Sequence, residues 1–243
     1  MATNKDKIEV EIPHLPIDEM ISEERAKTFR KILKKRNNQL TIVVENCHDP
    51  HNATAIIRSC DAFGVDTVHI ITDKHSFKIN NRVSKGTHNY VNIEIHKNIN
   101  DTYKALKAQD YTILASDLGA GKILNTQEVY EMYEKKKVAL VFGEESLGLT
   151  KEASENADGL FLIPMVGVTQ SLNVSVAVAV TTYAIREKEL CHNENGNLTL
   201  EEQTERYAHW VKRKRGIAVD RVMKDYKGQE MELEIYSDKN QLK

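Results

Sequence analysis

Short apolar runs alternate with amphipathic stretches through the middle of the chain. Five runs are rich in β-branched and aliphatic residues, as buried strands are, and a sixth alternates apolar and polar positions. They lie at residues 41–45, 67–72, 111–115, 138–142, 159–163 and 90–95. Helical patterns separate them at residues 52–64, 99–108, 129–134 and from residue 151 onward. Strands that alternate with helices at this spacing predict an α/β fold with a parallel sheet and helices on both faces.

One stretch is ambiguous by periodicity. Residues 174–180 read VSVAVAV, which alternates as a strand does. A predicted strand lies only ten residues upstream, however, and an α/β order requires a helix next. Ser171 or Asn173 can cap that helix, and residues 181–189 continue it. We therefore predict a helix here, whose small residues would allow a close helix–helix contact in a dimer.

Both ends of the chain are polar, with locally basic helices. Residues 1–18 are expected to be a loose lead-in, and Ser22 is expected to cap a helix rich in lysine and arginine. A polyanion would relieve the repulsion among these cations, although a solvated amphipathic helix is the alternative. A second basic helix at 198–215, capped by Thr199, precedes a polar tail. We expect three segments: 1–38 as lead-in and basic helix, 39–190 as the α/β domain, and 191–243 as basic helix and tail.

Composition narrows the class of protein. The chain has 243 residues, 40% of them apolar, which suffices for one sizeable core. A formal net charge of −2 excludes a strongly basic protein overall but leaves local basic patches possible. The three cysteines show no metal-binding spacing, and no stretch reaches the length of a membrane span. We expect a cytoplasmic protein that needs no metal.

Four predicted turns follow strands, which is where parallel sheets bind ligands. They read NCHDPHN, SDLGAG, GEESLG and PMVGVTQSLN, and they contain neither GxGxxG nor GxxxxGK[ST]. This argues against NAD and ATP and favours a nucleoside-like ligand without phosphates. In the last turn, the side chains of Gln170, Ser171 and Asn173 need hydrogen-bond partners, either at the turn itself or on a ligand.

The first of these turns leads into a helix that we expect to begin with Asn52 as its N-cap and to close at Gly64. Arg58 then lies beyond the edge of the apolar arc of this helix. Its guanidinium could reach toward the strand ends, while a surface ion pair with Asp61 is the alternative.

Three stretches of the sequence, HNATAIIRSCDAFGV, LVFGEESLGL and IPMVGVTQSLNVSVAVA, occur in the order of a known set of motifs. They resemble the three motifs of the SPOUT RNA 2′-O-methyltransferases, and most closely the branch that modifies guanosine 18 in the D-loop of tRNA. The resemblance runs from about Arg25 to Arg215. It implies an α/β fold with a deep C-terminal trefoil knot, S-adenosylmethionine bound at the knot, and an obligate homodimer that binds tRNA.

The resemblance also implies roles for individual residues. The catalytic positions that it implies are Asn52 and Arg58 in the first motif, Glu145 in the second, and Ser171 and Asn173 in the third. The implied cofactor contacts are Ser116, Gly143, Ile163 and Leu172, and the implied tRNA-contacting arginines are Arg25 and Arg36. Two stretches depart from the family pattern. In the second motif, the family has a small residue before its glutamate, whereas this chain has Glu144 before Glu145. The offset from Gly143 assigns the role to Glu145. After the third motif, relatives carry arginines where this chain has Arg186, Glu187 and Glu189.

Methyl transfer to a ribose hydroxyl requires that the hydroxyl be aligned and activated. A guanidinium stays protonated, so we expect Arg58 to hold a substrate phosphate and stabilise the developing alkoxide rather than act as a base. Asn52 would orient Arg58 or the ribose. The basic terminal helices and the loop at 74–89 would read the shape and phosphates of tRNA. The alternatives are the same chemistry on ribosomal RNA, a non-catalytic RNA-binding protein on this fold, and an ordinary nucleotide-binding enzyme.

Overall fold

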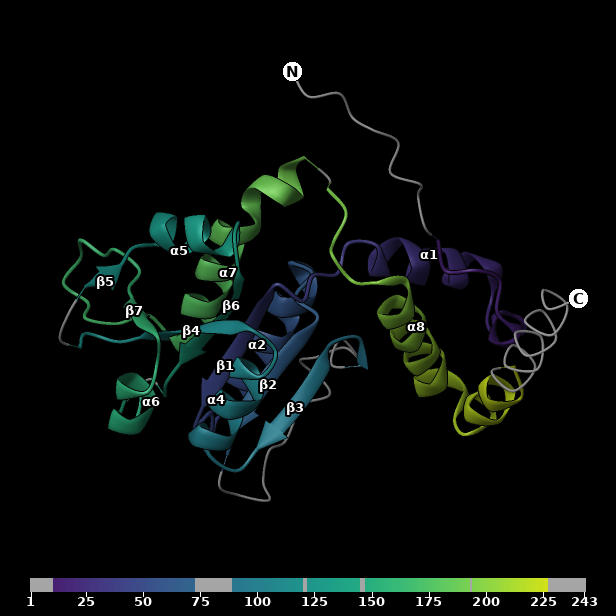
Figure 1. The fold of residues 1–243 in the computed structure, drawn as a ribbon, viewed down its shortest axis with the longest axis horizontal. Helices are drawn as coiled ribbons and strands as arrows, with labels where there is room; N and C mark the ends of the chain where they lie inside the picture. Colours follow the sequence, from purple (N-terminus) through teal and green to yellow (C-terminus); the bar gives the residue numbers. More distant parts are fainter. Residues whose placement is uncertain (1–10, 73–88, 120–121, 145–146, 193, 227–243) are drawn as a thin grey trace, which may run out of the picture. The chain divides into compact units, whose positions relative to one another are not determined.

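The computed structural model describes residues 11–72, 89–119, 122–144, 147–192 and 194–226 (Figure 1). The chain forms two compact units. Unit 1 contains Met1–Lys35 and Leu198–Lys243, so segments from both ends of the chain belong together. Unit 2 is the continuous stretch Arg36–Asn197.

Unit 2 is built on a parallel sheet, as predicted. Within the described residues the sheet has seven strands in the order β3-β2-β1-β6-β4-β7-β5, and every neighbouring pair is parallel. The strands are β1 (Leu40–Glu45), β2 (Thr67–Ile71), β3 (Asn92–His96), β4 (Tyr111–Ser116), β5 (Ile123–Leu124), β6 (Lys137–Phe142) and β7 (Gly159–Phe161). Because all strands are parallel, their carboxyl ends share one edge of the sheet.

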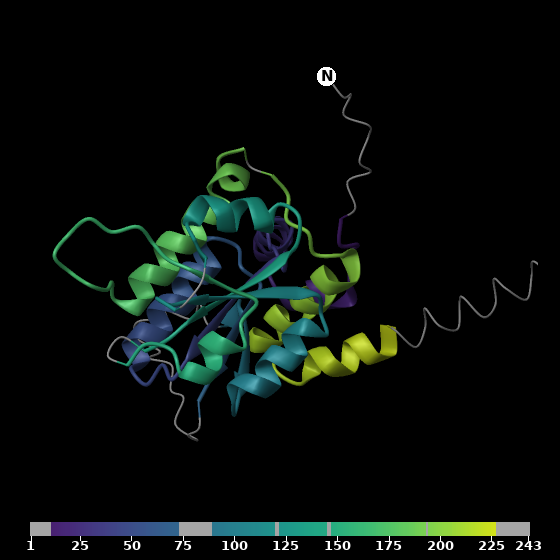
Figure 2. The same cartoon turned by 60° about the vertical axis from the view of Figure 1, so that its left-hand side comes forward.

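Helices cover both faces of this sheet, as the sequence pattern predicted (Figures 1 and 2). One face packs against α2 (Pro50–Ala62), α5 (Thr126–Tyr133) and α7 (Val174–Cys191). The other face packs against α4 (Ile99–Lys107) and α6 (Lys151–Glu155). In Figure 2 the blue α2 and the green α7 lie side by side, and the rings of Phe63 and Tyr183 pack together 5.6 Å apart near the end of α2.

The ambiguous stretch 174–180 is helical, which confirms the prediction. Asn173 is the N-cap of α7, and its side-chain oxygen accepts from the backbone N–H groups of Ser175 and Val176. Val174, Val178 and Ile185 are buried at helical spacing against the sheet. The tertiary need for a helix after β7 therefore overrides the alternating pattern of the residues.

The start of α2 differs from the prediction. The N-cap is Asp49, whose carboxylate accepts from the N–H of His51 at 2.8 Å, and Pro50 occupies the first helical position. Proline is favoured there because its fixed φ suits the helix and its missing N–H is not needed. Asn52 therefore lies inside the first turn of α2 and is not its N-cap.

Unit 1 contains a short 3₁₀ helix, η1 (Pro16–Met20), followed by α1 (Glu23–Leu33) and α8 (Leu200–Arg215). Ser22 caps α1, and Thr199 caps α8 with Glu202 completing the capping box, as predicted. Residues 218–226 are also helical. The rings of Tyr207 and Trp210 on α8 pack edge-on against Phe29 of α1, 6.3 and 5.3 Å away.

The lead-in is not loose over its described part. Ile12, Leu15 and Ile17 are buried in unit 1. The carboxylate of Asp18 in η1 accepts hydrogen bonds from Arg30, at 2.6 Å, and from Tyr207. The apolar residues of this segment lie among prolines and acidic residues without helical or strand periodicity, so their burial could not be predicted from the sequence.

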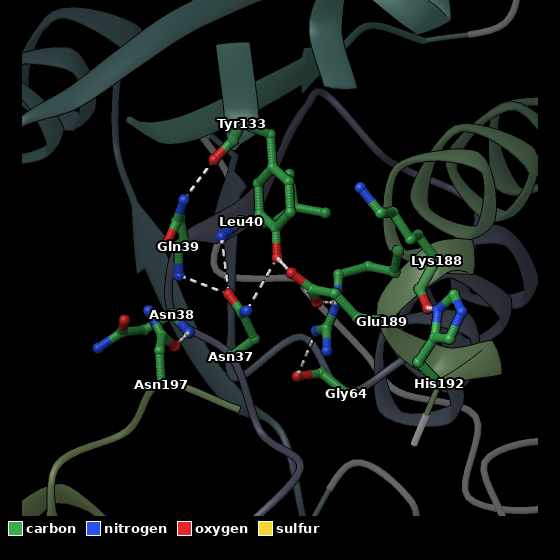
Figure 3. Close-up of polar contacts among 11 residues, drawn as sticks. Asn37, Asn38, Gln39, Leu40, Gly64, Tyr133, Lys188, Glu189, His192 and Asn197 are labelled. Carbon is green, nitrogen blue, oxygen red and sulfur yellow. Dashed lines mark hydrogen bonds and ion pairs between the residues drawn. The ribbon is translucent and has the colours of Figure 1, made fainter. Parts of the chain in front are cut away.

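The second half of α7 is fixed by a polar network (Figure 3). Asn37 donates from Nδ2 to the Tyr133 hydroxyl at 2.8 Å, and this hydroxyl donates to Glu189 at 2.9 Å. Glu189 also pairs with Nε of Arg186, at 2.7 Å. Burial raises the pKa of Tyr133, so its hydroxyl remains a donor. Arg186 and Glu189 therefore hold α7 against the sheet.

Candidate active site

A cavity of about 280 Å³ opens at the carboxyl ends of the neighbouring strands β6, β4 and β7. Its walls come from the turns after these strands and from the first turn of α7. The cavity is lined by all four residues with an expected cofactor role, Ser116, Gly143, Ile163 and Leu172, and by Ser171 and Gln170. Residues from three separate turns therefore meet here, because parallel strands end at the same edge.

The turn after β6 folds back on itself over Gly143. Glu144 and Gly148 exchange two backbone hydrogen bonds, at 3.2 and 2.8 Å, and Gly148 has a φ of 69°. A Cβ atom on Gly143 would lie 2.2 Å from the carbonyl carbon of Gly148, so no larger residue fits without opening the turn. Glycine at 143 thus lets the backbone form one wall of the cavity.

The far end of this turn is anchored to the sheet. Glu45, buried at the end of β1, accepts from the backbone N–H and the hydroxyl of Thr150, both at 2.8 Å. Thr150 is in turn the N-cap of α6. Glu145, expected to be a catalytic residue, lies outside the described residues.

A smaller cavity of about 90 Å³ adjoins the first, and the two share Gly143, Glu144 and Val174. Its other walls are Asn52 and residues 47–49 of the turn before α2. Asn173 donates from Nδ2 to Oδ1 of Asn52 at 3.0 Å. The first turn of α2 and the start of α7 are therefore joined beside this cavity, so the structure brings these two expected catalytic residues together.

Among the described residues that line the larger cavity, the charged ones are acidic. They are Asp117, next to Ser116, and Glu144, next to Gly143. Asp117 is held in place, since Oδ2 accepts from the Ser154 hydroxyl at 2.5 Å and Oδ1 from the Leu118 N–H at 2.7 Å. Apolar walls with two carboxylates suit a ligand that carries positive charge and no phosphate.

Sequence reasoning did not single out Asp117, Glu144, Phe142 or Met165 as lining residues. The signal that could have found them was their position, because each lies in or beside a turn that follows a predicted strand.

The three expected arginines have different positions. Arg58 is exposed on α2, six residues after Asn52, and it lines neither cavity. Arg25 is exposed on α1 in unit 1. Arg36 is only 1% exposed: its guanidinium pairs with Asp61 and donates to the carbonyl of Val65 at 3.0 Å. The structure thus contradicts the expected tRNA contact of Arg36, because its guanidinium is buried and engaged. Asp61, which was the alternative ion-pair partner for Arg58, pairs with Arg36.

The charge of α1 is also more balanced than expected. Arg30 pairs with Asp18, Lys34 with Glu11, and Lys27 with Glu23. Arg25 and Lys31 remain exposed on this helix. The cations of this helix therefore repel one another less than the sequence suggested.

The sequence of unit 2 identifies the chain as a methyltransferase of a known family. Residues 39–183 match the SpoU rRNA Methylase family, and the chain belongs to it. This range spans β1 to the middle of α7, and it includes all three turns that line the larger cavity.

Among its relatives are two enzymes named tRNA (guanosine(18)-2′-O)-methyltransferase. That of Thermus thermophilus is 35% identical over 70% of this chain and 85% of its own length. That of Aquifex aeolicus is 37% identical over 70% of this chain and 80% of its own length. A crystal structure described as the A. aeolicus TrmH/SpoU tRNA modifying enzyme is 32% identical. It superposes with a TM-score of 0.70 over 79% of this chain and 97% of that one.

Among the described residues, no helix combines the length and the apolar character needed to cross a membrane.

Proposed function

We propose that this chain transfers a methyl group from S-adenosylmethionine to the ribose 2′-hydroxyl of guanosine 18 in the D-loop of tRNA, and that it does so in the cytoplasm. Relatives with this named activity are similar to the chain over most of their length, which supports the choice of RNA. The observation that carries the proposal is the cavity at the strand ends, where three turns of the methylase domain converge.

The cavity fits the cofactor chemically. S-adenosylmethionine supplies a methyl group on a positively charged sulfur, bonded to a nucleoside and an amino acid. Ser116, Gly143, Ile163 and Leu172 would hold it, and backbone at Gly143 can approach it closely. The carboxylates of Asp117 and Glu144 would favour the positive charge, and the absence of a phosphate loop from the sequence agrees with this ligand.

The acceptor ribose would lie in the smaller cavity, between the cofactor and the start of α2. Asn173 would orient Asn52 through their hydrogen bond, and Asn52 would orient the ribose. Ser171 lines the neighbouring cavity and would help fix the substrate, with Glu145 in the adjoining turn. Arg58, always protonated, would bind an RNA phosphate and stabilise the alkoxide as the proton leaves.

We infer that the protein is a homodimer built on α7. Val176, Val180 and Tyr183 recur at helical spacing on its exposed face, and Met165, Val166 and Val168 are exposed in the preceding segment. Apolar patches of this kind mark protein interfaces. In such a dimer Arg58 would serve the cavity of the partner subunit, because it lines neither cavity of its own chain.

The proposal includes the deep trefoil knot that the family resemblance implies for the part of the chain ending in α7. The segments that carry the second and third motifs, from β6 to α7, surround one cavity, as that arrangement would require. A crystal structure traced continuously through residues 138–191 would test it.

The exposed Arg25 on α1 would contact tRNA from unit 1. Arg36 is left out of this interface because it is buried. Arg25→Glu should weaken tRNA binding. The control is Glu24→Lys, a charge reversal at the exposed residue beside it, which should not weaken tRNA binding.

Labelled methyl transfer to synthetic tRNA tests the whole proposal. Two transcripts would differ only at position 18, one with guanosine and one with 2′-deoxyguanosine, which lacks the acceptor hydroxyl. We expect label on the first and none on the second. Equal labelling of both, or labelling of ribosomal RNA fragments instead, would contradict the proposed substrate, and no transfer to any RNA would favour a non-catalytic binding protein.

A further inference from the structure

Three potential metal ligands meet on one face of the sheet, away from the cavities. His69 lies on β2, and Glu94 and His96 lie on the edge strand β3, which pairs with β2 (Figure 1). Nδ1 of His69 is 2.9 Å from Nε2 of His96 and 3.4 Å from Oε2 of Glu94. Nε2 of His96 is 3.8 Å from the same carboxylate oxygen.

The strand register explains why these side chains converge. His69 is directly opposite Glu94, and side chains two residues apart on a strand point to the same face, which brings His96 alongside. This cluster could not be predicted from the sequence, because His69 and His96 are 27 positions apart and only the pairing of β2 with β3 brings them together.

We propose that His69, Glu94 and His96 bind a divalent transition metal ion of the zinc type. Zinc bonds to imidazole nitrogen and carboxylate oxygen measure roughly 2.0–2.2 Å, so neighbouring ligand atoms in a tetrahedral site lie about 3.3–3.6 Å apart. The three observed separations, 2.9, 3.4 and 3.8 Å, bracket this value. Small side-chain rotations would therefore place all three atoms around one ion.

A neighbouring amide supports the carboxylate. Asn92, also on β3, donates from Nδ2 to Oε1 of Glu94 at 3.1 Å, which leaves Oε2 facing the two histidines. Groups that orient a ligand in this way are common behind metal ligands. His69 is only 3% exposed, whereas Glu94 and His96 are partly exposed, so an ion could enter from solvent.

The ligand set indicates which ions would bind. Two imidazoles and one carboxylate favour Zn²⁺, Co²⁺ and Ni²⁺, whereas Mg²⁺ and Ca²⁺ prefer oxygen ligands alone. Three protein ligands leave a fourth position for water. The ion would replace the hydrogen bond between the two rings. Each imidazole would then carry its hydrogen on the ring nitrogen that does not bind the ion.

The position of the site suggests what the ion would do. In the sheet order, β1 and β2 separate β3 from the strands that bear the larger cavity. The ion would therefore take no part in methyl transfer, and it would link the edge strand β3 to β2. Because β3 has a paired neighbour on one side only among the described strands, this link would slow its local opening.

Metal titration of chelator-treated protein tests the proposal. We expect one equivalent of Zn²⁺ by equilibrium dialysis, visible absorption bands on binding Co²⁺, and no competition from millimolar Mg²⁺. His96→Ala and Glu94→Gln remove partly exposed ligands and should each weaken Zn²⁺ binding by about tenfold or more. His192→Ala is the matched control, because His192 is exposed at the end of α7, and it should bind normally.

A cysteine control and a structural readout complete the test. A Cys47→Ser, Cys191→Ser variant should keep the site, and Zn²⁺ should slow amide hydrogen exchange in residues 92–96. Circular dichroism would confirm that each variant is folded. The proposal is wrong if no stoichiometric binding occurs, if both ligand variants bind as the parent does, or if the cysteine variant loses the ion.

Discussion

Asn173 donates its side-chain amide to Oδ1 of Asn52 over 3.0 Å, and this bond joins the first turns of α7 and α2. The other end of the Asn173 side chain caps α7, accepting from the N–H groups of Ser175 and Val176 at 3.0 and 3.4 Å. One residue thus performs two tasks, and substitutions can separate them.

Asn173→Ala removes both the cap of α7 and the contact with Asn52, whereas Asn52→Ala removes the contact and leaves the cap in place. We expect Asn173→Ala to lower the free energy of unfolding by about 1 kcal/mol more than Asn52→Ala, the usual value of an N-cap. Both variants should lose methyl transfer. Urea unfolding followed by circular dichroism measures the difference, and equal stability losses would mean that the cap contributes little.

Gly143→Ala should abolish cofactor binding without unfolding the sheet. The new methyl group would collide with backbone at Gly148, so the turn that forms one wall of the cavity must open. Gly167→Ala is the matched control, because the nearest atom to its Cβ would be 4.0 Å away. Calorimetric titration with S-adenosylmethionine should show no detectable binding in the first variant and unchanged binding in the second.

Mixed dimers would show which subunit Arg58 serves. Arg58→Ala and Gly143→Ala should each be inactive alone. If Arg58 completes the cavity of the partner subunit, co-refolding equal amounts should restore about a quarter of the parent activity, because about half of randomly paired dimers are mixed and each has one complete site. If Arg58 acts within its own subunit, the mixture stays inactive.

The three thiols should differ in reactivity. Cys60 is fully buried, and burial raises its pKa to about 12, so it should react only when the protein unfolds. Cys191 is exposed and should react with or without ligands. Cys47 lines the smaller cavity, and bound S-adenosylmethionine with tRNA should slow its alkylation. Mass spectrometry of labelled peptides measures all three, and equal protection of Cys191 would indicate a general effect.

Unit 1 should lose stability in acid through Asp18. Burial acts to raise the pKa of Asp18, but hydrogen bonds from Arg30, Tyr207 and the Leu15 N–H outweigh burial and lower it. This stabilisation is present above the unfolded pKa of about 3.9 and is lost as the pH falls through the lower folded value.

The only tryptophan, Trp210, packs against Phe29 in this unit, so its fluorescence reports the acid transition. Asp18→Asn should be less stable at pH 7 and should show a flatter dependence on pH below 4. An unchanged acid transition in this variant would mean that other carboxylates control it.

Local patterns were sufficient to predict most elements of the sheet and its helices. Apolar runs such as the one that forms β6 are bounded by clear turn residues. Residues 174–180 alternate as a strand does, but the order of strands and helices correctly predicted a helix there. The two-residue strand β5 escaped notice, since it is too short to show a period. At the start of α2, Asp49 and Asn52 are both suitable N-cap residues. Asp49 caps the helix because Pro50 then occupies the first helical position.

Long-range pairing accounts for what the sequence could not reveal about the site. The charge of Arg36 suggested an RNA contact, but its partner Asp61 is 25 residues away and only the fold buries the pair. Each turn that lines the cavity could be predicted from the sequence, but not that the turns meet at one cavity. Their convergence depends on the strand order β6-β4-β7, which periodicity does not encode.

The pairing of α1 with α8 in unit 1 has a consequence for biosynthesis. On the ribosome α1 emerges early, while α8, which covers Phe29, follows only after all of unit 2 has been translated. The continuous unit 2 can fold as it leaves the exit tunnel, but α1 must wait with its apolar side uncovered. A nascent chain stalled before residue 198 would therefore be a preferred client for chaperones that hold exposed apolar segments.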